Sequence, residues 1–147
     1  MRISIASDHA GFDAKEEVKA YLTKLGHEVI DCGTDSKESC DYPIFGRAAA
    51  IKVAGGEAER GILICSSGEG IMIAANKIKN VRCGLAYNDD VAKLIRMHNN
   101  ANMVAFGASF MKIEDIIRRI DLFLNTEFEG GRHERRVNEI EPSTNNK

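Results

Sequence analysis

Hydrophobic and polar positions follow two alternating patterns along this 147-residue chain. Short, nearly continuous apolar runs of strand length give way to longer stretches in which apolar residues recur at helical spacing. The runs predict five strands, at residues 3–7, 28–32, 61–65, 81–87 and 103–106. Strands with so few polar positions are typical of a parallel sheet that is covered on both faces.

A helix is expected after each strand. The expected helices are Phe12–Leu25, an alanine-rich segment ending at Gly55, residues 71–78, a segment whose apolar face includes Val91, Leu94 and Ile95, and a last one from Ile113 to Phe123. Five strand–helix units predict an α/β fold, a three-layer sandwich around a five-stranded parallel, Rossmann-like sheet. We expect one domain over residues 1–147, with residues 140–147 as a disordered tail.

Composition and charge narrow the class of protein. Hydrophobic residues make up 44% and charged residues 29%, as in an ordinary globular protein. The net charge of −2 argues against a nucleic-acid binder, which needs a basic surface. No apolar run approaches the roughly 18 residues of a membrane span, and no signal peptide is visible. We therefore expect a cytoplasmic protein with no membrane or nucleic-acid partner.

The four cysteines, Cys32, Cys40, Cys65 and Cys83, form no CxxC pair. We expect them to be reduced thiols. Because the four histidines are scattered as well, we expect no metal site, and zinc binding is the alternative.

Two polar segments are expected at the same edge of the sheet, where ligands of parallel α/β folds bind. Ser7-Asp8-His9 follows the first strand, and the glycine-rich turn Cys65–Gly70 follows the third and leads into a helix. A thiol and several backbone N–H groups at a helix N-terminus suit a site that holds negative charge. Singly, each has a structural explanation, because Asp8 can cap a helix and Cys65 can fill the core.

Several motifs together resemble one family, the B-type ribose-5-phosphate isomerases, which also includes galactose-6-phosphate isomerase subunits and allose-6-phosphate isomerases. The motifs are SDHAGF (7–12), DYP (41–43), GILICSSGEGIMIAANK (61–77), HNNANM (98–103), AFG (105–107) and GGRHERRV (130–137). The resemblance implies an aldose–ketose isomerase that moves a proton between carbons 1 and 2 of a sugar phosphate through an enediolate. It implies no metal and no organic cofactor.

The resemblance also implies roles for the cysteine turn. Cys65 matches the catalytic base of the family's cysteine branch, and Ser67 matches a hydroxyl that assists proton transfer between the sugar oxygens. The turn amides are the expected oxyanion cradle; they belong to Ser66, Ser67, Gly68, Glu69 and Gly70. The family's other branch uses a glutamate at the position of Ile71, so Glu69 is not the expected base.

The remaining roles follow from the other motifs. His98 resembles the acid/base that opens the sugar ring, with Asn99 as a polar contact, and Asp8 resembles a carboxylate that binds sugar hydroxyls or assists ring opening. The residues that match phosphate or substrate ligands are His9, Tyr42, Arg132 and Arg136. Many relatives carry an arginine where this chain has Ser109, which puts the strength or geometry of the phosphate subsite in question. Altered substrate length and compensation by Arg135 or His133 are the alternative explanations.

The resemblance implies a homodimer, in some members paired into a tetramer, with each site built from two subunits. Ribose 5-phosphate is the expected substrate. The alternatives are a six-carbon substrate, such as allose or galactose 6-phosphate, and a non-catalytic sugar-phosphate-binding module on the same fold.

Overall fold

Five parallel strands form one sheet in the order β2-β1-β3-β5-β4. The computed structural model describes residues 1–142. The strands are β1 (Arg2–Ser7), β2 (Glu28–Asp31), β3 (Arg60–Cys65), β4 (Cys83–Leu85) and β5 (Met103–Gly107). The predicted parallel α/β sheet is thus confirmed.

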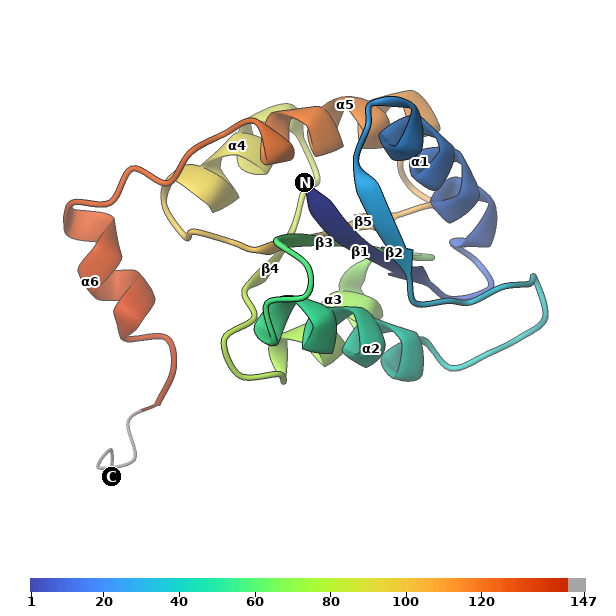
Figure 1. The fold of residues 1–147 in the computed structure, drawn as a ribbon, viewed down its shortest axis with the longest axis horizontal. Coiled ribbons are helices and arrows are strands. Elements are labelled where there is room, and N and C mark those ends of the chain that lie inside the picture. Colours follow the sequence, from blue (N-terminus) through green and yellow to red (C-terminus); the bar gives the residue numbers. More distant parts are fainter. Residues whose placement is uncertain (143–147) are drawn as a thin grey trace.

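Helices cover both faces of this sheet, as Figure 1 shows. One layer holds α1 (Phe12–Lys24), α4 (Asp89–Met97) and α5 (Ile113–Leu124), and the other holds α2 (Tyr42–Ala54) and α3 (Glu69–Asn76). Alternate strand residues point to the two layers, so that Ile62 and Ile64 join the first core and Leu63 and Cys65 the second. The predicted three layers are confirmed. No helix among residues 1–142 is both long and apolar enough to span a bilayer.

The largest differences from the predicted boundaries are in β4 and α3. β4 is shorter than the expected strand at residues 81–87, because the backbone N–H of Arg82 donates to a side chain, the Asn102 carbonyl, at 2.8 Å. At the other end, Tyr87 is 62% exposed and precedes the N-cap of α4. α3 begins at Glu69, two residues earlier than expected, because Gly68 takes a left-handed conformation (φ 84°) that only glycine adopts readily and starts the helix at once.

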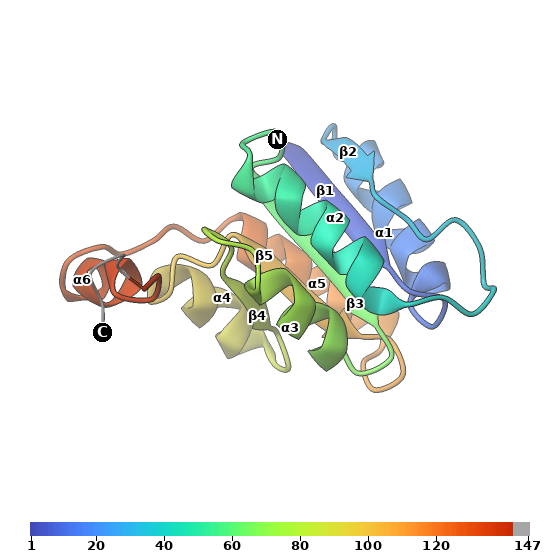
Figure 2. The same ribbon diagram turned by 90° about the horizontal axis from the view of Figure 1, so that it is seen from below.

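A sixth helix, α6 (Arg132–Asn138), was not predicted. Val137 is the only apolar residue of α6, so the sequence of this helix has no amphipathic pattern. Figures 1 and 2 show α6 apart from the three layers, beyond the end of α4. Of the expected disordered tail, residues 140–142 are described, and Glu141 accepts a hydrogen bond from the Asn80 N–H at 2.7 Å. The remaining tail residues, 143–147, lie outside the described part of the chain.

Candidate active site

Asp8 and Cys65 lie side by side where β1 and β3 end. Ser7 pairs with Ile64 in the sheet register, and the Asp8 N–H donates to the Ile64 carbonyl at 3.3 Å, which makes Asp8 and Cys65 the next neighbouring positions. Both are buried, with 7% and 4% of their surfaces exposed. Asp8 also accepts the Gly11 N–H at 3.1 Å in the turn before α1, but the N-cap of α1 is Gly11 and no side chain caps that helix.

The cysteine turn directs one of its backbone N–H groups at the sulfur. Gly68 N–H donates to Cys65 Sγ at 3.2 Å, and Glu69 N–H donates to Ser67 Oγ at 3.2 Å. The turn opens α3, so the positive end of that helix dipole faces the thiol. Such a turn can hold negative charge on the sulfur or on a ligand oxygen beside it.

This turn packs directly on the end of β5. A Cβ added at Gly107 would lie 2.4 Å from the Ser67 carbonyl oxygen, and one at Gly68 would lie 2.8 Å from the Phe106 carbonyl carbon. No real Cβ tolerates such distances, so both positions require glycine. The close approach fixes the cradle against the core of the sheet.

Two further predicted residues stand at the rim of the turn. The Cys40 backbone N–H donates to His9 Nδ1 at 3.2 Å, which leaves the proton of a neutral His9 ring on Nε2. The Tyr42 ring lies against Gly70, where an added Cβ would sit 2.7 Å from it. The site half at this edge therefore brings together Asp8, His9, Tyr42 and the turn Cys65–Gly70.

A hydrogen bond between two hydroxyls joins the cradle to the loop after β5. Ser66 Oγ and Ser109 Oγ are 2.8 Å apart. Ser109 therefore stands at this edge of the sheet, and its hydroxyl is engaged with the cradle itself.

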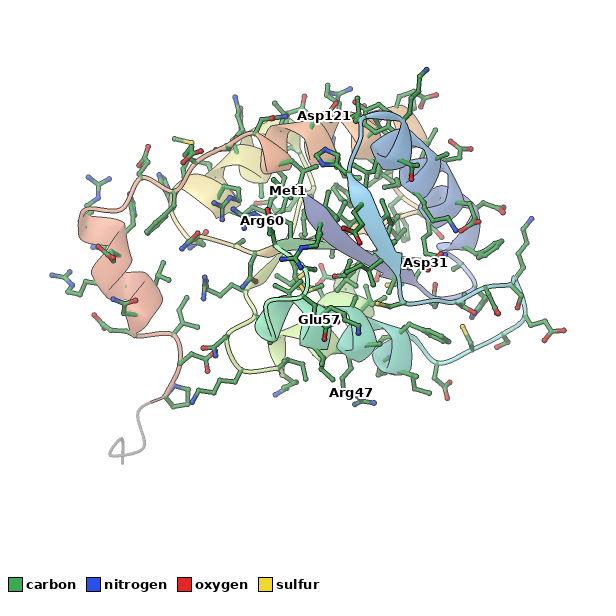
Figure 3. The ribbon with its side chains drawn as sticks, viewed as in Figure 1. Met1, Asp31, Arg47, Glu57, Arg60 and Asp121 are labelled. Atoms are coloured by element: carbon green, nitrogen blue, oxygen red, sulfur yellow. The ribbon has the colours of Figure 1, made fainter. Side chains whose placement is uncertain are left out.

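A cluster of charged residues lies at the same edge of the sheet, at the end of β2. Asp31, at the carboxyl end of β2 (Figure 3), accepts hydrogen bonds from Lys15 at 2.7 Å, from Lys19 at 2.9 Å and from the Gly33 N–H at 2.9 Å. Burial raises the pKa of Asp31, but these donors outweigh it, and the pKa falls below its usual value. Because Lys15 is fully buried, the cluster fastens α1 to β2 beside the loop that carries Asp8.

The other predicted residues lie at the opposite edge of the sheet. α4 starts beyond the end of β4 and runs back, so that His98 caps it near the start of β5. The four residue steps from Met103 to Gly107 along β5 separate the two edges by about 13 Å. In Figure 3, Met1 and Arg60 mark the edge opposite to Asp31.

His98, Asn99, Arg132 and Arg136 are therefore not brought to Cys65 within one chain. Asn99 is exposed and lines a groove of about 800 Å³ between the β4 edge and the segment Ile140–Pro142. Arg132 and Arg136 are exposed on α6, on the single face that their four-residue spacing implies. The predicted residues thus form two separate groups.

His98 makes contacts that the sequence did not reveal. Its ring stacks on that of His133, with centroids 4.2 Å apart and planes inclined by 14°. Glu129 Oε1 lies 3.8 Å from His98 Nε2 and 3.4 Å from His133 Nε2. Glu129 is the residue that the motif analysis missed; its spacing of four from His133, across two glycines, is the only signal in the sequence.

His98, Glu129 and His133 are also a group of potential metal ligands among residues 1–142, with ligand atoms within 4.8 Å of one another. Nearly parallel rings direct their nitrogen lone pairs side by side rather than toward a common point. Arg132 and Arg136 add positive charge next to His133. The group is therefore poorly arranged for a cation.

Comparison with known proteins places this geometry in context. Residues 3–140 match the family model described as Ribose/Galactose Isomerase. The chain is 44% identical over 139 residues to ribose-5-phosphate isomerase B of Escherichia coli K12, covering 95% of this chain and 93% of that one.

Solved structures of proteins named ribose-5-phosphate isomerase B have closely similar folds. Ribose-5-phosphate isomerase B of Clostridium thermocellum superposes with a TM-score of 0.94 at 45% identity, covering 95% of both chains. The enzyme of Mycoplasma genitalium, solved with bound ribulose-5-phosphate, gives a TM-score of 0.90 at 38% identity and covers 95% of this chain and 93% of its own.

Proposed function

The chain belongs to the ribose/galactose isomerase family, and we propose that it interconverts ribose 5-phosphate and ribulose 5-phosphate. The observation that carries this proposal is the pairing of Asp8 with Cys65, whose sulfur accepts an amide N–H at the start of α3. The substrate follows from relatives that are named for ribose 5-phosphate and from one solved with ribulose-5-phosphate.

In this proposal Cys65 is the base. Its thiolate takes the proton from carbon 2 of the aldose and returns it to carbon 1, while negative charge passes to the sugar oxygens. The amides from Ser66 to Gly70 receive that charge, and the Ser67 hydroxyl moves a proton between the two oxygens. Glu69 is exposed and sits on the first turn of α3, and it takes no part in the proton transfer.

The remaining roles, ring opening and the binding of sugar and phosphate, combine the second group of residues with Asp8 and His9 of the first. His98 opens the sugar ring with help from Asp8, and Asn99 binds the sugar. His9, Arg132 and Arg136 hold the phosphate, for which guanidinium groups present paired donors.

Because the two groups lie about 13 Å apart or more, a complete site requires a second copy of the chain. We propose a homodimer in which His98, Asn99 and the arginines of α6 from one copy meet Cys65 and Asp8 of the other. Two-fold symmetry makes this exchange reciprocal and gives two equal sites. The position of α6 outside its own three layers supports this exchange (Figure 2).

A coupled assay that compares ribose 5-phosphate with allose 6-phosphate and galactose 6-phosphate tests the substrate. We expect the highest kcat/KM for ribose 5-phosphate. A preference for either hexose phosphate would establish the alternative substrate class. Binding of all three without turnover would show a binding module and refute the proposal.

A further inference from the structure

We propose that Glu129 and His133 are positioning residues that orient the His98 ring for opening the sugar. The inference rests on the proposed role of His98 and concerns the two side chains that contact it from the segment after α5. Neither residue needs to touch the substrate for this purpose.

The position of His98 explains why it needs support. It caps the C-terminus of α4 and its side chain is 38% exposed. An exposed side chain at a helix end samples several rotamers, whereas an acid/base must keep its ring nitrogen within hydrogen-bond reach of the reacting oxygen. The stacked His133 ring removes this freedom on one face of His98.

The supporting segment is itself fixed to α4. The Glu129 N–H donates to the Met97 carbonyl at 3.1 Å, one residue before His98. Gly130 (φ 67°) and Gly131 (φ 55°) then turn the chain through positive-φ conformations that residues other than glycine rarely adopt. This turn places His133, which is 8% exposed, against the His98 ring. The double glycine thus sets the relation between α6 and His98.

Charge distinguishes the two rings. Desolvation, the neighbouring His98 and the charge of Arg132 lower the pKa of His133, with Arg136 adding to and Glu129 opposing the effect. His133 is therefore the neutral partner of the stack near pH 7. The Glu129 carboxylate, 3.8 Å from His98 Nε2, remains available to balance a proton that His98 carries during ring opening.

The two directions of the reaction separate ring opening from proton transfer. Ribose 5-phosphate is mostly cyclic, whereas ribulose 5-phosphate is open-chain because its phosphate occupies the oxygen that would close the ring. We expect Glu129→Gln and His133→Gln to lower kcat from saturating ribose 5-phosphate roughly tenfold or more, since general acid–base catalysis contributes at least about a hundredfold. KM for ribose 5-phosphate should fall as well, because cyclic sugar that is not opened accumulates in the site and the ratio of the two kcat/KM values is fixed by the equilibrium constant. From saturating ribulose 5-phosphate, kcat of both variants should stay within about twofold of the wild type, because the open-chain aldose can leave the site and cyclise in solution.

Glu127→Gln, an exposed neutralisation two residues away, is the matched control and should leave both directions unchanged. Glu129 is exposed as well, so its variant tests the idea without a buried change. Equal losses in both directions would show a merely structural role, and unchanged forward rates would show no role; either result overturns the inference. A wild-type chain without turnover in either direction would overturn the proposed function itself.

Discussion

Complementation between two inactive variants tests whether the site is shared between copies. Cys65→Ala removes the proposed base at the carboxyl edge of the sheet, and His98→Asn removes the proposed ring-opening group at the amino edge. Each variant refolded alone should be nearly inactive from ribose 5-phosphate, because both of its sites carry the defect. In a mixed dimer, one site combines both substitutions and the other combines an intact Cys65 with an intact His98.

The expected magnitude follows from this geometry. Equal amounts of the variants, unfolded together in urea and refolded, should give mixed dimers as about half of the molecules, each with one intact site of two. The mixture should therefore recover about one quarter of the activity of wild-type chain refolded in the same way. The assay measures ketose formation from ribose 5-phosphate. A mixture no more active than its two parents would refute the shared site.

Three further predictions concern single residues. Cys65→Ala should lower kcat roughly a hundredfold or more in both directions, whereas Glu69→Gln should keep most activity; equal losses would show that the base is misassigned. Arg132→Ala should raise KM for ribose 5-phosphate roughly tenfold, as expected for losing a charged hydrogen bond, and an unchanged KM would place it outside the site. Asp31→Asn leaves the buried Lys15 without its shortest ion pair, so urea unfolding at pH 7 should show a loss of about 3 kcal/mol. Because the folded-state pKa of Asp31 is lowered from 3.8, this difference should be complete above about pH 4 and shrink as the pH falls further, and a pH-independent difference would contradict the assignment.

The sheet and its carboxyl edge could be predicted because local patterns determine them. Continuous apolar runs indicate buried parallel strands. The rule that ligands bind at the carboxyl ends of such strands predicted that Asp8 and the cysteine turn lie at the same edge. The register of β1 and β3 confirms that Asp8 and Cys65 are neighbours. The boundaries of β4 depended on Asn102, a partner 20 residues away, which no local pattern contains.

The second group of residues shows where sequence patterns stop being informative. His98 follows Val91 and Leu94 at helical spacing and could have extended the core face of α4, yet it lies half-exposed at the end of that helix. α6 carries no apolar stripe, so nothing in its sequence indicates its place outside the sandwich. A motif can mark such residues as functional, but their distance from Cys65 emerges only from the direction of α4 through space.

The glycine contact between the cysteine turn and β5 has a consequence for how the catalyst responds to temperature. Since Gly107 and Gly68 press the turn onto the sheet backbone, the entropy of aligning its amides is lost when the chain folds and not again at each turnover. Warming should therefore leave the amides of the proposed oxyanion cradle aligned until the sheet itself unfolds. Catalytic decline and global melting should then coincide in a single cooperative transition.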